Sequence, residues 1–146
     1  MTETQTGGCL CGAVTITAKV GNGIQACHCR QCQTWTGGSP YLCVPVSEAE
    51  VRGAETIEAY HASAWGERAF CRVCGTTVYW TMKGQPPHSV AVGLFPDQSG
   101  MSVTEEIFVD YRPPWLPPFA GAAQSTEAEE NEKLHAWMAE QAILGE

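Results

Sequence analysis

The stretch GGCLCGAVTITAKV, residues 7–20, joins a close pair of cysteines to the clearest strand pattern in the chain. Apolar residues alternate with other residues along its second half, at Val14, Ile16, Ala18 and Val20. This period of two is typical of a strand with one buried face. The following GNG, residues 21–23, favours a turn, and we expect a second strand to begin near Ile24.

Further strand patterns follow at short intervals, separated by turns rich in Gly and Pro. They cover residues 41–46, 76–82, 89–94 and 105–111. Pro45 favours an edge position for the first of these strands, because proline cannot donate to a ladder. With 15 Gly and 9 Pro in 146 residues, the sequence predicts a mainly β, antiparallel body.

The C-terminal part of the chain has a different character. Residues 111–121 contain too many prolines for a helix or a strand and should run as an extended strap. Thr126 and Glu129 then have the spacing of a capping box, ahead of an apolar stripe formed by Leu134, Trp137, Met138 and Gln141. We therefore expect a β domain over residues 1–121 and an acidic helical tail over 122–146. The tail should pack on its own domain or mediate a homodimer.

Four of the eight cysteines form two similar pairs, each followed by glycine: Cys9 and Cys11 before Gly12, and Cys71 and Cys74 before Gly75. A zinc knuckle points backbone amides at its thiolates, and the residue after the second cysteine often needs the positive φ that glycine adopts without strain. The two pairs should therefore supply one tetrahedral, structural zinc site. Such a site would pin the strand at 12–20 to the strand at 76–82 or 89–94 and close a long loop.

The sequence ACHCRQC, residues 26–32, holds three more cysteines: Cys27, Cys29 and Cys32. Three thiolates fill three of the four positions around zinc, and catalytic zinc sites keep an open position. We therefore predict a second zinc ion in the chain, with these cysteines as the ligands of a catalytic site. Cys43 and His28 are alternative fourth ligands, and a metal-free redox cluster is the rival interpretation.

Charge and hydropathy disfavour two classes of partner. The formal net charge is −8, but six Glu and one Lys in residues 125–146 carry −5 of it, so the body is nearly neutral. Such a body lacks the basic footprint of a nucleic-acid binder. The sequence has no apolar run of membrane-spanning length and no signal-peptide pattern, so we expect a cytoplasmic protein that binds neither nucleic acid nor membrane.

Four segments together resemble one known family. They are GGCLCGAV (7–14), CHCRQCQTWTGG (27–38), SAWGERAFCRVCGTTVYW (63–80) and FVDYRPPW (108–115). In order and spacing, they are similar to the glutathione-dependent formaldehyde-activating enzyme family, which includes centromere protein V. The resemblance covers about residues 7–119.

The resemblance implies small coiled antiparallel sheets around zinc-bearing hairpins. It implies a structural zinc at the four paired cysteines and a second site at the other three. The activity it implies is carbon–sulfur bond formation between glutathione and formaldehyde, giving S-(hydroxymethyl)glutathione. The chain departs from the family pattern at GLFPDQ (93–98), where many relatives have an acidic stretch, and in its tail past residue 121.

The enzyme hypothesis is thus a zinc-dependent carbon–sulfur lyase or synthase acting on a small thiol and a small carbonyl. In it, Trp35 would shape the mouth of the pocket, unless it is an ordinary core aromatic. The alternatives are a zinc-stabilised binding domain without turnover and a thiol redox sensor that uses the three-cysteine cluster.

Overall fold

The computed structural model describes residues 3–144, which are mainly β with a C-terminal helix, as predicted. These residues fall into two compact units. The first unit comprises residues up to 25 together with 42–103, and the second comprises 26–41 together with the residues from 104 onward. The set of four cysteines lies inside the first unit, and the set of three lies inside the second.

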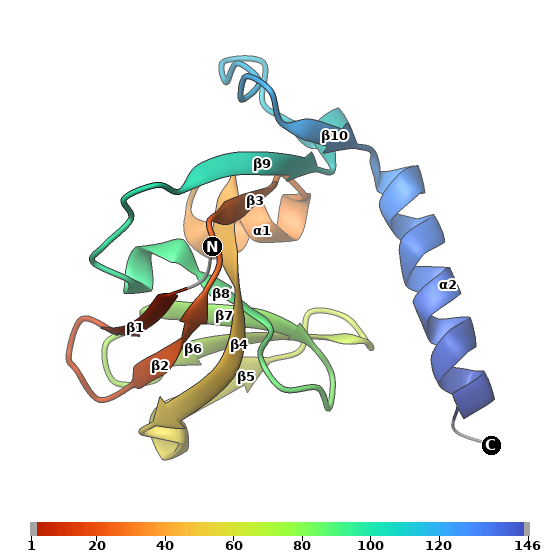
Figure 1. Ribbon diagram of the computed structural model, residues 1–146. Coiled ribbons are helices and arrows are strands. Elements are labelled where there is room, and N and C mark those ends of the chain that lie inside the picture. Colours follow the sequence, from red (N-terminus) through yellow and green to blue (C-terminus); the bar gives the residue numbers. More distant parts are fainter. Residues whose placement is uncertain (1–2, 145–146) are drawn as a thin grey trace. The chain divides into compact units, whose positions relative to one another are not determined.

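The first unit is an antiparallel arrangement of seven strands (Figure 1). The strands are β1 (Glu3–Gly8), β2 (Thr15–Val20), β4 (Tyr41–Arg52, from Leu42 onward in this unit), β5 (Ile57–Tyr60), β6 (Gly66–Cys71), β7 (Thr77–Met82) and β8 (Ser89–Ala91). Their ladders run in the order β1, β2, β4, β8, β7, β6, β5. Short 3-10 turns follow β4 and β8, at Ala54–Thr56 and Val92–Leu94.

The edge position predicted from Pro45 is wrong, because β4 lies between β2 and β8. Pro45 is tolerated there because it lies where the ladder with β2 stops. The last pair of that ladder joins Val20 to Val46, and beyond it the Pro45 carbonyl accepts a hydrogen bond from Gly21 N at 2.9 Å. The missing N–H of Pro45 therefore lies at the end of the ladder with β2 and not in its middle.

The core of the first unit follows the predicted alternation along β2. Val14, Ile16, Ala18 and Val20 are all at most 2% exposed. Strand β4 contributes Val44 and Val46. The remaining buried core residues are Cys9, Cys71, Val78, Val90, Val92, Leu94 and Phe95. One face of β2 and one face of the first half of β4 are therefore removed from water, and such burial is the main source of stability for a layer of this kind.

Two predicted strands end earlier than expected. The pattern at 89–94 becomes β8 and then the 3-10 turn at Val92–Leu94. The pattern at 105–111 becomes the end of β9 (Ser102–Ile107) and then a second turn, Val109–Tyr111. Phe108 has φ 57°, a left-handed conformation that no strand can continue.

The second unit holds the end of β3 (Gly23–Cys27), helix α1 (Arg30–Thr36), β9 from Thr104 onward, β10 (Ala123–Ser125) and helix α2 (Glu127–Leu144). β10 pairs with β9 in parallel. Helix α1 was not predicted, because seven residues with no apolar period give no helical signal.

The predicted capping box at the start of α2 is confirmed. Thr126 N donates to Glu129 Oε1 at 3.0 Å, and Glu129 N donates to Thr126 Oγ1 at 3.3 Å. Helix α2 continues from β10 (Figure 1), and Leu134 and Trp137 are partly buried whereas Met138 is 41% exposed. Within residues 3–144, no helix is long and apolar enough to cross a membrane.

Candidate metal centres

The four-cysteine cluster lies at two similar turns of the first unit. Cys9 and Cys11 occupy the turn between β1 and β2, Cys71 is the last residue of β6, and Cys74 lies in the turn between β6 and β7. As the sequence predicts, the glycine after each pair has positive φ, 81° at Gly12 and 79° at Gly75. Their amides close the turns: Gly12 N donates to Cys9 O, and Gly75 N donates to Cys71 O.

The sulfur atoms of these four cysteines fit a tetrahedral metal ion. All four Sγ atoms lie within 4.8 Å of one another. The Cys9 and Cys11 sulfurs are 3.6 Å apart, and the Cys11 and Cys71 sulfurs are 3.8 Å apart. Thiolates bound to zinc at about 2.3 Å lie roughly 3.8 Å from one another in a tetrahedron. The donor set and its spacing therefore suit zinc.

Hydrogen-bond donors beside Cys9 and Cys74 lower the pKa of these two thiols, whereas contact with the neighbouring thiols raises that of Cys11. Val14 N donates to Cys9 Sγ at 3.3 Å. The Thr76 side chain and backbone lower the pKa of Cys74 to about 5, with the hydroxyl 3.1 Å from its sulfur. Thr76 Oγ1 also accepts a hydrogen bond from Leu10 N, so this one side chain joins the two turns. No local pattern distinguishes Thr76 from the other threonines.

The three-cysteine cluster lies in the second unit, where β3 ends and α1 begins. Cys27 is the last residue of β3, Cys29 is the N-cap of α1, and Cys32 lies in its first turn. Their sulfurs also lie within 4.8 Å of one another. Cys29 Sγ accepts a hydrogen bond from Cys32 N at 3.2 Å, as an N-cap side chain does.

Crowding makes this cluster suitable for a cation. Close contact with the thiols of Cys29 and Cys32, together with burial, raises the pKa of Cys27. A divalent ion would offset the repulsion among these groups, stabilise the thiolate form of all three cysteines and release their protons on binding.

The two alternative fourth ligands are engaged elsewhere. Both ring nitrogens of His28 have other partners, Ser39 Oγ at 2.8 Å and Glu106 Oε1 at 2.9 Å. Cys43 Sγ contacts Gln25 Oε1 at 3.8 Å, and its side chain is buried. Among the described residues, the cluster of metal-ligating side chains at this site has three members, Cys27, Cys29 and Cys32.

Comparison with known proteins decides the family. The sequence model of the glutathione-dependent formaldehyde-activating enzyme family matches residues 4–111, which include all seven clustered cysteines. The chain belongs to this family. A Schizosaccharomyces pombe protein named as an uncharacterized lyase is 29% identical over 110 residues, which are 73% of this chain and 80% of that protein. A crystal structure of a Rhodobacter sphaeroides protein shares the fold, with a TM-score of 0.50 and 23% identity over 83% of this chain and 99% of the other.

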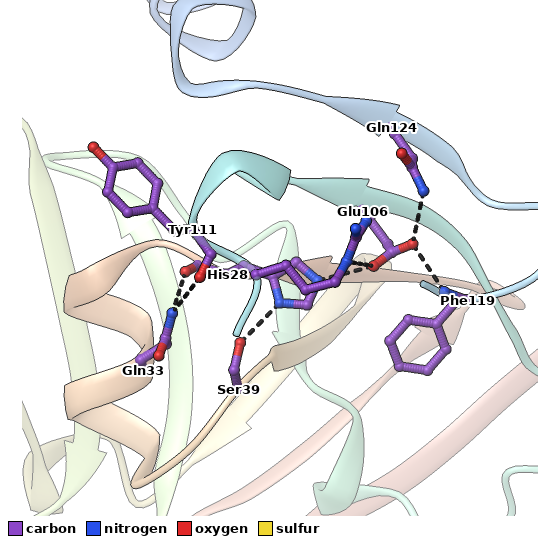
Figure 2. Close-up of polar contacts among 8 residues, drawn as sticks. His28, Gln33, Ser39, Glu106, Tyr111, Phe119 and Gln124 are labelled. Atoms are coloured by element: carbon purple, nitrogen blue, oxygen red, sulfur yellow. Dashed lines mark hydrogen bonds and ion pairs between the residues drawn. The ribbon is translucent and has the colours of Figure 1, made fainter. Parts of the chain in front are cut away.

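The family match includes a buried histidine–carboxylate pair that the sequence did not reveal. Figure 2 shows His28 between Ser39 and Glu106, and the His28 and Glu106 side chains are both 0% exposed. An ionised carboxylate only accepts hydrogen bonds, so His28 Nε2 donates to it. In the neutral ring, Nδ1 then accepts from the Ser39 hydroxyl.

Residues past the family match complete the surroundings of Glu106. Arg112 Nε donates to Oε1 at 3.2 Å. Phe119 N and Gln124 Nε2 donate to Oε2 at 3.0 and 3.4 Å (Figure 2). Burial alone would raise the pKa of Glu106, but the hydrogen bonds from His28, Phe119 and Arg112 outweigh it and lower that pKa. Glu106 is therefore a buried carboxylate whose negative charge is stabilised by its donors.

A second set of contacts links α1 to α2. Gln33 Nε2 donates to the carbonyls of His28 and Tyr111, at 2.8 and 3.0 Å (Figure 2). The Tyr111 hydroxyl donates to Glu127 Oε2 at 3.0 Å, in the first turn of α2. The start of the helical tail is therefore fixed to the same unit as the three-cysteine cluster.

Trp35 has a packing partner within this unit. Its ring centroid lies 5.1 Å from that of Tyr41, in a tilted arrangement. This geometry is typical of a packed aromatic pair. Trp35 itself is partly buried.

Proposed function

We propose that this protein is a zinc-dependent carbon–sulfur lyase or synthase that acts on a glutathione-type thiol and a small carbonyl such as formaldehyde. In the synthetic direction, the thiol sulfur forms a bond to the carbonyl carbon, and the thiol proton ends on the carbonyl oxygen. The reaction needs no oxidant or reductant. Two zinc ions per chain are part of the proposal.

One observation carries this proposal: the second cluster gathers three thiols, while His28 and Cys43 are engaged elsewhere. A three-ligand zinc site has room for a substrate atom, whereas a four-cysteine site is closed. Family membership and the name of the fungal relative support a lyase reaction, and the family description supports glutathione and formaldehyde as the substrates.

The residues of the chain have distinct roles in this proposal. Cys27, Cys29 and Cys32 hold the catalytic zinc, which when bound supplies a Lewis acid that favours the thiolate form of a substrate thiol. Helix α1 fixes Cys29 and Cys32 relative to each other through the Cys32 N to Cys29 Sγ hydrogen bond. The four-cysteine cluster has a structural role.

The test is the substitution Cys29→Ser. Serine is itself a favoured N-cap, so α1 should persist while one metal ligand is lost. We expect native mass spectrometry to show two zinc ions per chain in the wild type and one in the variant. Formation of S-(hydroxymethyl)glutathione, followed by NMR with labelled formaldehyde, should fall to the spontaneous rate.

Cys43→Ser is the matched control, since it removes a buried thiol outside both clusters. It should retain both metal ions and the wild-type rate. A wild-type rate in Cys29→Ser would disprove the catalytic role of the cluster. One zinc ion and a disulfide among Cys27, Cys29 and Cys32 in the wild type would instead favour the redox sensor.

A further inference from the structure

His28 is the residue between two members of the three-cysteine cluster, and all of its polar groups have partners in the second unit. Its N–H donates to Ile107 O at 3.1 Å, and its carbonyl accepts from Gln33 Nε2 at 2.8 Å. Its ring nitrogens contact Ser39 and Glu106 (Figure 2). A residue held at four points cannot rotate without breaking several hydrogen bonds.

The position of His28 matters because Cys27 and Cys29 are its direct neighbours in the chain. Their sulfurs have to converge within 4.8 Å of Cys32 Sγ. In extended backbone, side chains two positions apart share a face, and the N-cap Cys29 is extended, with φ −61° and ψ 155°. The sulfurs of Cys27 and Cys29 can therefore face Cys32 together only while the backbone of His28 keeps its conformation.

Glu106 contacts the His28 ring through its carboxylate. Its carboxylate is fully buried and accepts hydrogen bonds from His28, Arg112, Phe119 and Gln124. A buried carboxylate with several donors is expensive to move, because any displacement leaves charge or donors unsatisfied in a low-dielectric site. Glu106 is therefore a rigid anchor for the His28 ring.

We propose that Glu106 is a positioning residue for the three-cysteine cluster and acts on it through His28. The proposal rests on the function proposed above, in which this cluster holds a metal ion. In many metal sites, an outer carboxylate orients a histidine that is itself a ligand. Here the histidine binds no metal, and the carboxylate instead fixes the backbone between two ligands.

This arrangement depends on the chain beyond the family match. That match ends at residue 111, whereas Arg112, Phe119 and Gln124 follow it. Gln124 is the β10 residue paired with Glu106 of β9. The strap and β10 thus supply donors that keep the Glu106 carboxylate in place.

The experiment compares Glu106→Gln and Glu106→Ala with the wild-type full chain. Glu106→Gln keeps the size of the side chain and an acceptor for His28, but removes the charge. Release of each zinc ion to a chelator is followed by a colorimetric indicator, and native mass spectrometry gives the number of ions retained. We expect Glu106→Ala to speed the release of one zinc ion by at least about tenfold, which is typical when a residue that supports a metal ligand is changed. The release rate of Glu106→Gln should lie between those of the wild type and Glu106→Ala. Release from the four-cysteine cluster should not change.

A double-mutant cycle with His28→Gln tests the route. If Glu106 acts through His28, the double variant should release zinc no faster than the more affected single variant. The matched control is Glu67→Gln, which alters a His–Glu pair of the first unit, His61 and Glu67 at 3.2 Å. It should leave release from both clusters at the wild-type rate.

Site-resolved alkylation separates failure of this inference from failure of the proposed function. With metal removed, Glu106→Gln should change the alkylation rates of Cys27, Cys29 and Cys32 and leave those of the four paired cysteines unchanged. Wild-type protein with a single zinc ion would refute the proposed function, and the alkylation would still test the positioning. Unchanged rates at both clusters, or equal changes at both, would overturn the role of Glu106.

Discussion

Removal of one ligand from the four-cysteine cluster should cost a large part of the protein's stability. In Cys71→Ser, a buried sulfur is lost from the site that joins the β1–β2 turn to the β6–β7 turn. Cys11 and Cys71 are 60 positions apart in sequence, yet their sulfurs lie 3.8 Å apart. A cross-link that closes a loop of this length removes chain entropy worth about 4 kcal/mol.

That free energy translates into a measurable shift of the melting temperature. For a chain of this size, about 4 kcal/mol corresponds to roughly 10–15 °C. Thermal unfolding is followed by circular dichroism, with one zinc-saturated sample and one chelator-treated sample for each protein. We expect the chelator to lower the melting temperature of the wild type to a value close to that of chelator-treated Cys71→Ser.

Cys43→Ser serves again as the control, because Cys43 is a buried cysteine of the same unit outside both clusters. It should unfold well above Cys71→Ser in the presence of zinc. The reasoning fails if Cys71→Ser and Cys43→Ser melt together, or if the wild type loses its metal without a change in melting temperature.

Two further predictions concern the turn glycines and the tail. Gly75→Ala should destabilise the protein by about 1–2 kcal/mol in chemical denaturation, because φ is 79° and an added Cβ meets no atom within 4 Å, so the cost is purely conformational. Gly38→Ala, which also meets nothing but has no positive φ, should be nearly neutral, and equal effects would refute the conformational origin. If the partly exposed stripe of α2 mediates a homodimer, deletion of residues 126–146 should convert the dimer to a monomer and so halve the mass measured by light scattering. An unchanged oligomeric state would exclude that contact.

The two clusters show how much a local pattern can reveal. The trailing glycines identified Cys9, Cys11, Cys71 and Cys74 as two similar turns, because positive φ is a property of a single residue. The same holds for the capping box at Thr126 and Glu129, whose hydrogen bonds join residues three apart. The alternation along residues 14–20 predicted the buried face of β2 for the same reason: the pleat fixes which side chains share a face.

Features that depend on distant partners were missed or predicted wrongly. Pro45 suggested an edge strand, but whether its missing N–H matters depends on where β2 ends beside it. Residues 92–94 and 109–111 were predicted to continue strands but form tight turns. Short apolar segments of this kind occur in both structures, so their composition does not distinguish them. Arg112 gave no sign of its role, since its carboxylate partner is identifiable only in the fold.

The sequence by itself determined the mainly β class, the family, and the two sets of cysteines, since each of these rests on short-range spacing or on motif order. Only the tertiary structure decided what surrounds the three-cysteine cluster. Glu105 and Glu106 are identical neighbours in one strand, yet Glu106 is fully buried against His28 while Glu105 is partly exposed. Which of the two glutamates is buried depends on which face of β9 is covered and on where the donors of Arg112, Phe119 and Gln124 converge. Both are consequences of chain packing that no local pattern encodes.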